Sequence, residues 1–361
     1  MTPASEARLP WWSLAVPVAA CIVLGFALGG AAGTLWAAIF GAALIASVLA
    51  AVHHAEVVAH RTGEPFGTLI LAVAVTIIEV ALIVSLMLGN GEGKALIARD
   101  AVFAAIMIVC NGVVGLCILF GGIRHHELAF RVEGTNPALT VLAALATLTL
   151  VLPTFTISSP GPTFTPSQLA FAGLSSLVLY GTFVFIQTVR HRDYFLPAAS
   201  GDEEHAAPPS AKAALISGAL LALSLVVVVG LAKTLSPSIE SVLRSVGAPK
   251  SAVGIAIAML VLLPESFAAM RAALANRLQI SFNLALGSAL ASIGLTIPAV
   301  AFVSIVFGLP LSLGLDPVGL VLLALTLIVS VLTLATGRTT LLQGVVHLVI
   351  FAAYLFLTLV P

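Results

Sequence analysis

The sequence predicts an all-α integral membrane protein with about eleven transmembrane helices. Only 8% of the 361 residues are charged and 60% are hydrophobic, whereas a soluble domain carries about 25% charged residues. Eleven apolar stretches, each long enough to cross a bilayer as a helix, are separated by polar breaks. The stretches are residues 11–29, 33–52, 66–88, 101–120, 137–157, 168–189, 213–232, 252–270, 280–307, 317–336 and 341–360.

The first stretch is expected to be a retained helix. Its n-region holds a single arginine, Arg8, balanced by Glu6, whereas a secretory signal begins with a net positive charge. Trp11 and Trp12 are typical of an aromatic anchor at the membrane surface. Lys+Arg and Asp+Glu both number 15, and no basic face stands out, so we expect the lipid bilayer as a partner and no nucleic acid.

The distribution of positive charge orients the helices. With the N-terminus in the cytoplasm, ten of the 15 Lys and Arg residues fall on the inner side and five on the outer side. Cytoplasmic loops are enriched in these residues. We therefore expect a multi-pass protein with a cytoplasmic N-terminus and an outer C-terminus.

Eleven helices divide into one peripheral helix and two groups of five. The expected organisation is an N-terminal helix over 1–32, a first five-helix repeat over 33–189, a cytoplasmic linker over 190–212 and a second five-helix repeat over 213–361. Because five is odd, the second group enters the membrane upside down. Inverted repeats of this kind are typical of secondary transporters.

Two glutamates stand apart from the other acidic residues. Glu79 lies inside the third apolar stretch and Glu265 inside the eighth, at equivalent places in the two expected repeats. A carboxylate within the bilayer costs roughly 2.5–3.5 kcal/mol, so two at matched places predict a function. One alternative is that each is a neutral, hydrogen-bonded packing group. We expect both to face a central cavity and to bind cations or protons.

The chemistry of such a pair couples two fluxes. Burial and a neighbouring carboxylate both favour the protonated form, so the empty pair should hold protons at neutral pH. A divalent cation can replace them because it balances both charges. An empty, doubly ionised site is disfavoured, which predicts exchange in opposite directions.

Neutral oxygens would complete the ligand shell, because Ca²⁺ takes about 6–8 oxygens. Thr76 precedes Glu79 by one turn, although its hydroxyl has an alternative partner in its own helix backbone. Asn111 is expected to be a ligand or to line the cavity, with a bond to a neighbouring helix as the alternative. Ser288 and Ser292 lie near one face of the ninth stretch. Pro264 either breaks the helix before Glu265 and frees carbonyls, or makes a packing kink.

Four long stretches carry a family resemblance. They are GEPFGTLILAVAVTIIEVALIVS (63–85), NGVVGLCILFGGIRHHELAF (111–130), VRHRDYFLP (189–197) and LLPESFAAMRAALANRLQISFNLALGSALASIGLTIPAV (262–300). They resemble bacterial ChaA-type calcium/proton antiporters, also described as sodium(potassium)/proton antiporters, in the cation/proton exchanger branch of the calcium/cation antiporter superfamily. The resemblance covers roughly residues 60–300.

This resemblance implies eleven helices, two inverted five-helix repeats, and an ion and proton site at Glu79 and Glu265. The wider family carries Gly-Asn-x-x-Glu, where this sequence reads VTIIE and VLLPE, so Thr76 and Leu262 stand in the Asn position. The family's polar position in the next helix maps to Asn111 and Ser292. The replacement of Asn by Thr76 and Leu262 changes the number of oxygen ligands available to a cation, and the selectivity for calcium depends on that number.

The expected function is secondary active export of Ca²⁺ from the cytoplasm in exchange for H⁺, by alternating access in a bacterial inner membrane. The alternatives are a Na⁺(K⁺)/H⁺ antiporter with the same site and, in another class, a passive cation channel. The spans contain no nucleophile–base pair or metal triad, so neither an enzyme nor a cofactor is expected; the cation is cargo. A homo-oligomer is compatible with the sequence, which does not require one.

Histidines and a run of acids suggest weaker features. His53, His54 and His60 are expected on a solvated turn before the third helix, with a pH-sensing cluster as the alternative. His347 lies inside the last stretch, as a structural group or as part of a proton path. The acidic run 202–204 is expected to be a solvated part of the linker, with calcium regulation as the alternative.

Overall fold

A computed structural model describes residues 9–63, 66–88, 93–195, 209–245, 249 and 251–360. Within these ranges, eleven helical stretches are long and apolar enough to cross a bilayer. This finding confirms the all-α membrane fold predicted from the apolar stretches. The acidic run 202–204 lies outside the described residues.

The helices group into two compact units, each described by itself. The first unit comprises Met1–Gly91 and Asp202–Val246, and the second comprises Glu92–Gly201 and Gly247–Pro361. These units do not follow the order of the chain, because the first unit takes helices from the beginning and the middle of the sequence. The predicted division into repeats at 33–189 and 213–361 is a different grouping, and it stays a prediction.

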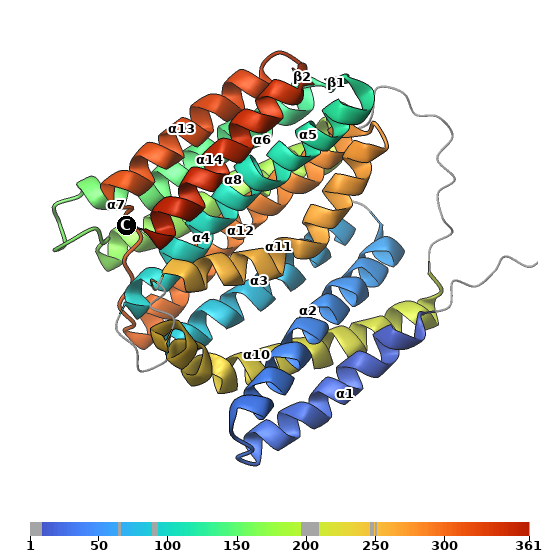
Figure 1. The fold of residues 1–361 in the computed structure, drawn as a ribbon, viewed down its shortest axis with the longest axis vertical. Helices are drawn as coiled ribbons and strands as arrows, with labels where there is room; N and C mark the ends of the chain where they lie inside the picture. Colours follow the sequence, from blue (N-terminus) through green and yellow to red (C-terminus); the bar gives the residue numbers. More distant parts are fainter. Residues whose placement is uncertain are drawn as a thin grey trace, which may run out of the picture. The chain divides into compact units, whose positions relative to one another are not determined.

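Among its described residues, the first unit is built from four helices (Figure 1). They are α1 (Trp11–Leu28), α2 (Thr34–Thr62), α3 (Phe66–Met87) and α10 (Ala211–Ser245). α10 packs along α2, and both also contact α1 and α3. Gly230 lets α10 approach α1 closely, because an added Cβ atom there would lie 2.6 Å from a methyl carbon of Leu24.

The second helix is longer than its apolar stretch. α2 continues through the histidines to Thr62, so the expected turn is wrong, although His60 is exposed to solvent. His54 is fully buried, and its Nε2 donates to the Ser13 carbonyl at 2.8 Å. His53 packs against Trp12, with ring centroids 4.9 Å apart. These contacts to α1 explain why His53 and His54 are removed from solvent.

The second unit holds the remaining described elements. They are η1 (Lys94–Leu96), α4 (Ile97–Met107), η2 (Ile108–Val113), α5 (Val114–His125), β1 (Glu127–Ala129), α6 (Val132–Ala146), η3 (Thr147–Val151), α7 (Leu152–Phe155), α8 (Pro166–Phe185), η4 (Ile186–Arg190), α9 (Arg192–Phe195), α11 (Ser251–Leu274), α12 (Leu278–Phe307), α13 (Pro317–Leu334), β2 (Arg338–Thr340) and α14 (Leu341–Leu359). η1, α4, the π-helical segment η2 and α5 form one continuous span over Lys94–His125.

Glycines lie at close helix contacts in the second unit. A Cβ atom at Gly254 of α11 would lie 2.7 Å from the Ala101 nitrogen of α4. A Cβ atom at Gly294 of α12 would lie 2.5 Å from the Tyr180 Cβ of α8. Small residues at such crossings allow membrane helices to pack backbone to backbone.

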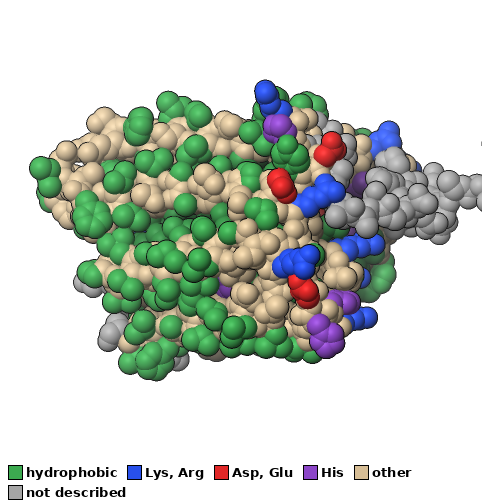
Figure 2. Space-filling view, turned by 90° about the horizontal axis from the view of Figure 1, so that it is seen from above, with side chains coloured by type: hydrophobic (Ala, Val, Ile, Leu, Met, Phe, Trp, Pro, Cys, Tyr) green, Lys and Arg blue, Asp and Glu red, His purple; other side chains and the backbone are tan. Residues whose placement is uncertain are grey.

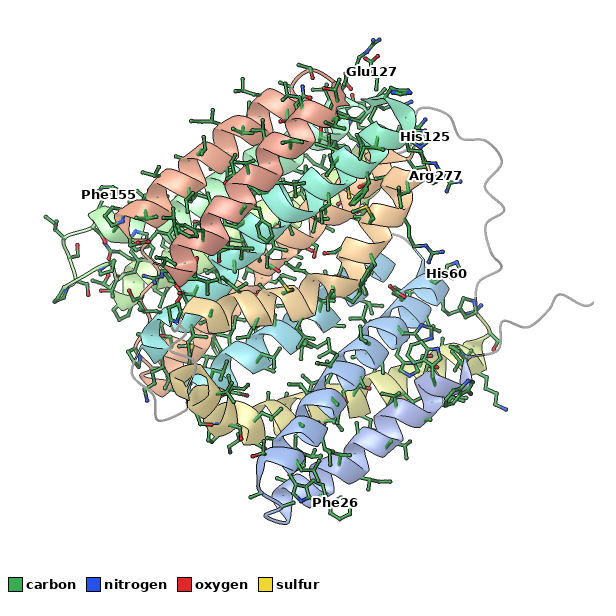
Figure 3. The ribbon with its side chains drawn as sticks, in the orientation of Figure 1. Phe26, His60, His125, Glu127, Phe155 and Arg277 are labelled. Atoms are coloured by element: carbon green, nitrogen blue, oxygen red, sulfur yellow. The ribbon has the colours of Figure 1, made fainter. Side chains whose placement is uncertain are left out.

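The two ends of the second unit differ in character. At one end β1 pairs with β2 in antiparallel register, and Arg338 forms an exposed ion pair with Glu127 at 3.2 Å. Figure 3 places His125, Glu127 and Arg277 at this end and Phe155 at the other. At the Phe155 end, Asp316 caps α13 by accepting a hydrogen bond from the Gly319 nitrogen at 3.1 Å, as its position before Pro317 suggests.

Large hydrophobic side chains face outward along the helices of both units (Figure 2). Examples are Phe26 in the first unit, 53% exposed, and Phe171 in the second, 66% exposed. Apolar surface of this extent is unfavourable in water and is what a bilayer-spanning helix presents to lipid.

Candidate functional site

Glu79 is a buried acid in the middle of a membrane span of the first unit. It lies in α3, within the span Ile70–Met87, and is 1% exposed. Thr76, one turn earlier on the same face, is also buried. The Thr76 hydroxyl donates to the Ala72 carbonyl at 2.8 Å. This bond uses the hydroxyl proton, so the lone pairs of Thr76 Oγ1 are still free to act as a cation ligand.

Glu265 is the corresponding acid of the second unit. It lies in α11, in the middle of the span Gly254–Leu274, and is half-buried. α11 runs through Pro264 without interruption, so the predicted break before Glu265 is wrong. Pro264 has no N–H group, and therefore it cannot donate to the Leu260 carbonyl one turn back. Ser266 donates its hydroxyl proton to the Leu262 carbonyl at 2.6 Å.

The two glutamates thus belong to different compact units. Each unit positions its own carboxylate at mid-span, and each is accompanied by a hydroxyl that bonds its own helix backbone. The expectation that the two carboxylates meet in one cavity stays a prediction.

Asn111 lies at the centre of a buried polar chain in the second unit. It belongs to the π-helical segment η2 and is fully buried. Its Nδ2 donates to Thr326 Oγ1 of α13 at 2.8 Å, and its Oδ1 lies 3.2 Å from Nδ1 of His347 in α14. His347 is also fully buried, and its Nε2 lies 3.0 Å from Thr333 Oγ1. Asn111 therefore bonds neighbouring helices, which was the alternative to a role as a cation ligand. It also lies in a π-helical turn, and such turns occur frequently at functional sites.

The sequence indicated Asn111 and His347 separately, but it indicated neither Thr326 nor Thr333. Thr326 and Thr333 lie seven positions apart on one face of α13. Many threonines in membrane helices share this spacing only by chance, so it gave no usable signal. The structure brings the four side chains together because η2, α13 and α14 contact one another.

The serines of the ninth span occupy two environments. Ser292 of α12 is buried, whereas Ser288 of the same helix is half-buried. Ser281 and Thr296 also lie inside the protein. The expected polar face therefore turns inward, and it can offer hydroxyl oxygens without exposing them to lipid.

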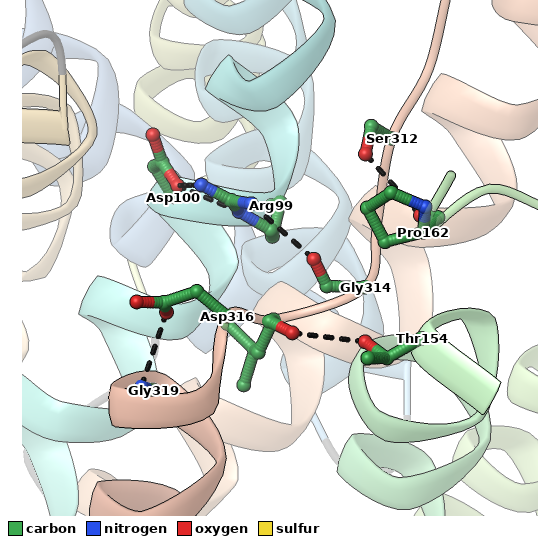
Figure 4. A network of polar contacts seen from close by, with 9 residues as sticks. Arg99, Asp100, Thr154, Pro162, Ser312, Gly314, Asp316 and Gly319 are labelled. Carbon is green, nitrogen blue, oxygen red and sulfur yellow. Dashed lines mark hydrogen bonds and ion pairs between the residues drawn. The ribbon is translucent and has the colours of Figure 1, made fainter.

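Charged groups cluster at the Phe155 end of the second unit (Figure 4). Arg99 donates through Nε and Nη2 to Asp100 Oδ1 at 2.8 and 2.7 Å, and through Nη1 to the Gly314 carbonyl at 3.2 Å. Both side chains are largely buried, 15% and 12% exposed. Arg99 lies in the first turn of helix α4. A pocket of about 180 Å³ opens beside this pair, bordered by Asp316 and Tyr354.

The comparisons with known proteins agree with this architecture. The family model for the sodium/calcium exchanger protein matches residues 32–189 and 216–360. The y4hA protein of Sinorhizobium fredii is 49% identical, over 99% of this chain and 98% of its own length. The sodium-potassium/proton antiporter ChaA of Escherichia coli is 36% identical, over 95% of this chain and 94% of its own length. The solved structure of native YfkE has a TM-score of 0.71 at 17% identity, covering 97% of this chain and all of YfkE.

The chain therefore belongs to the sodium/calcium exchanger family. Membership identifies it as an ion antiporter in a membrane and not as an enzyme. The passive channel expected as an alternative does not fit this family.

Proposed function

We propose that the protein exchanges cations for protons across a bacterial inner membrane, with Glu79 and Glu265 forming one ion and proton site. The observation that carries the proposal is the depth of these two acids. Both lie in the middle of a span, whereas the other acidic side chains of the described spans lie within two turns of a span end. Those others are Glu56, Asp100 and Glu133.

The two matched stretches of the family model support the pairing. One begins at residue 32 and the other at residue 216, and each glutamate follows its start by nearly the same number of residues. Two copies of one module that each contribute a mid-membrane acid fit a transporter with its site at the repeat interface. The antiport logic then follows from charge, because two protons or one divalent cation neutralise the pair equally.

Neutral oxygens would complete the site. Among the described residues, no three His, Cys, Asp or Glu side chains form a metal cluster. A bound cation would therefore draw on two carboxylates together with hydroxyl and amide oxygens. Thr76, Asn111, Ser288 and Ser292 supply these groups in our proposal, which also assigns the cation as cargo and no resident cofactor.

The cation has two candidates. Ca²⁺ suits two carboxylates because its charge balances both. Na⁺ and K⁺ are favoured by the similarity to ChaA, which is a sodium-potassium/proton antiporter. The direction we propose is export from the cytoplasm, driven by protons that enter down their gradient.

Charge placement supports an N-terminus in the cytoplasm and a C-terminus outside. At the β1–β2 end the second unit carries several arginines, including Arg277, which Figure 3 labels there. Others at this end are Arg124, Arg131 and Arg338. The positive-inside rule assigns this end to the cytoplasm.

Proteoliposomes that contain a pH-sensitive dye test the proposal. Addition of Ca²⁺, Na⁺ or K⁺ in separate runs should release protons with the wild type, and the active ion identifies the cargo. Glu79→Gln and Glu265→Gln should each reduce exchange to background, because an amide holds neither the charge nor the exchangeable proton. Glu133→Gln, which changes an exposed acid at the start of α6, should retain exchange. Proton-coupled cation flux in the double Gln variant would overturn the assignment.

A further inference from the structure

A directional hydrogen-bond chain connects three membrane spans in the second unit. The Thr333 hydroxyl, the His347 ring, the Asn111 amide, the Thr326 hydroxyl and the Met107 sulfur follow one another at contact distances of 3.0, 3.2, 2.8 and 3.4 Å. All five side chains are buried. A buried polar chain is favourable when every member has its partners.

The chain has one self-consistent polarity. The Asn111 oxygen is an acceptor, so His347 Nδ1 must carry the proton, and Nε2 of the neutral ring must then accept from Thr333. The Asn111 nitrogen donates to Thr326 Oγ1, which in turn donates to the Met107 sulfur. In this arrangement Nδ1 donates and Nε2 accepts, and the ring also hydrogen-bonds with the Cys110 backbone.

Close helix packing fixes the distance between the ring and the amide. A Cβ atom at Gly115 of α5 would lie 3.1 Å from His347 Cβ and 3.2 Å from the Gly344 carbonyl oxygen of α14. A Cβ atom at Gly112 would lie 3.3 Å from the ring of Phe351. The backbones of η2 and α5 therefore lie close to α14 near Asn111, which keeps the imidazole beside the amide and the Cys110 backbone.

The Asn111 amide oxygen can accept one more interaction. An amide oxygen has two lone pairs, and Asn111 Oδ1 uses one of them to accept from His347. The other lone pair can ligate a cation. Without His347 the amide could turn over and present its nitrogen, which repels a cation.

We propose that His347 is a positioning residue for cation exchange, which holds the Asn111 amide so that its oxygen stays available to the transported ion. The inference rests on the proposed function, since it needs Asn111 to serve the cation. His347 itself contacts Asn111, Thr333 and the Cys110 backbone, and its effect on the ion passes through the amide.

Two substitutions separate the two ring nitrogens. The side-chain nitrogen of Asn stands near the place of Nδ1, and that of Gln near the place of Nε2. His347→Asn should keep the bond to Asn111 and a wild-type KM for the cation. His347→Gln should lose that bond and raise the KM about three- to tenfold, the range for one lost hydrogen bond, with a smaller change in kcat. Ser330→Ala, which removes another buried hydroxyl of α13 outside the chain, should leave KM unchanged.

The measurement is proton release from proteoliposomes titrated with Ca²⁺, Na⁺ and K⁺ in separate runs. Equal KM values for His347→Asn and His347→Gln, with wild-type flux intact, would overturn this inference alone. No cation-driven proton flux from the wild type would overturn the proposed function and this inference with it. If neither His347 variant accumulates in the membrane, Thr326→Ser and Thr326→Val give the same comparison from the other side of Asn111. Ser keeps the hydroxyl that accepts from Nδ2, so only Val should raise KM; equal KM values for these two variants would overturn the inference.

Discussion

Gly344 of α14 packs directly on the backbone of Leu119 in α5. An added Cβ atom at Gly344 would lie 2.7 Å from the Leu119 nitrogen and 3.0 Å from the Gly115 carbonyl oxygen. Neither contact involves a side chain that can rotate away. The position of α14, and of His347 on it, therefore depends on the absence of a side chain at Gly344.

Gly344→Ala should push α14 away from α5 and destabilise the protein by about 1–3 kcal/mol, the usual cost of overpacking. Thermal unfolding of the purified protein in detergent measures this loss. Gly181→Ala is the matched control in α8, because a Cβ atom there would meet no atom within 4 Å. A variant at Gly344 as stable as the one at Gly181 would contradict the close packing.

Thr76→Val should weaken cation binding while the protein stays folded. Valine keeps the shape of threonine but has no oxygen to offer a cation. Thr182→Val is the control, because Thr182 likewise donates to its own helix backbone, at 2.7 Å, on the exposed surface of α8. We expect the KM for the cation to rise several-fold at Thr76 and to stay unchanged at Thr182. Equal effects in cation titrations would remove Thr76 from the site.

Asp100→Asn should destabilise the second unit by about 1–3 kcal/mol, because it leaves the largely buried Arg99 guanidinium without its charged partner. Glu127→Gln breaks the ion pair with Arg338, whose side chains are 56% and 73% exposed. Exposed pairs contribute about 0–1 kcal/mol. Thermal unfolding compares the two variants. If Asp100→Asn lowers the melting temperature no more than Glu127→Gln does, the buried Arg99–Asp100 pair contributes little to stability.

His54→Leu should loosen the first helix, because it removes the bond from His54 Nε2 to the Ser13 carbonyl. Loss of this hydrogen bond should lower the free energy of unfolding by about 0.5–1.5 kcal/mol. His54→Gln places a nitrogen near the Nε2 position and should restore most of the stability. Thermal unfolding compares the two, with the exposed His60→Gln as a neutral reference. Equal melting temperatures for Leu and Gln would contradict the contact.

Local patterns were sufficient for the spans and for the two acids. A helix must satisfy its own backbone in lipid, so a run of about 20 apolar residues marks a span wherever it packs. Glu79 and Glu265 were recognised because each interrupts such a run near its middle. The ends of spans were harder to predict, since α2 extends past its apolar run to bury His54 against α1.

The sequence by itself determined an eleven-span helical membrane protein with one acid deep in each half. The tertiary structure alone decided which polar groups share a partner. Asn111 bonds residues that lie 215 and 236 positions away, and Arg99 reaches a carbonyl 215 positions away. Hydrophobic periodicity reports only which face of a helix turns inward. Which helices then meet is set by glycine contacts and side-chain shape, which act between distant segments and leave no local pattern.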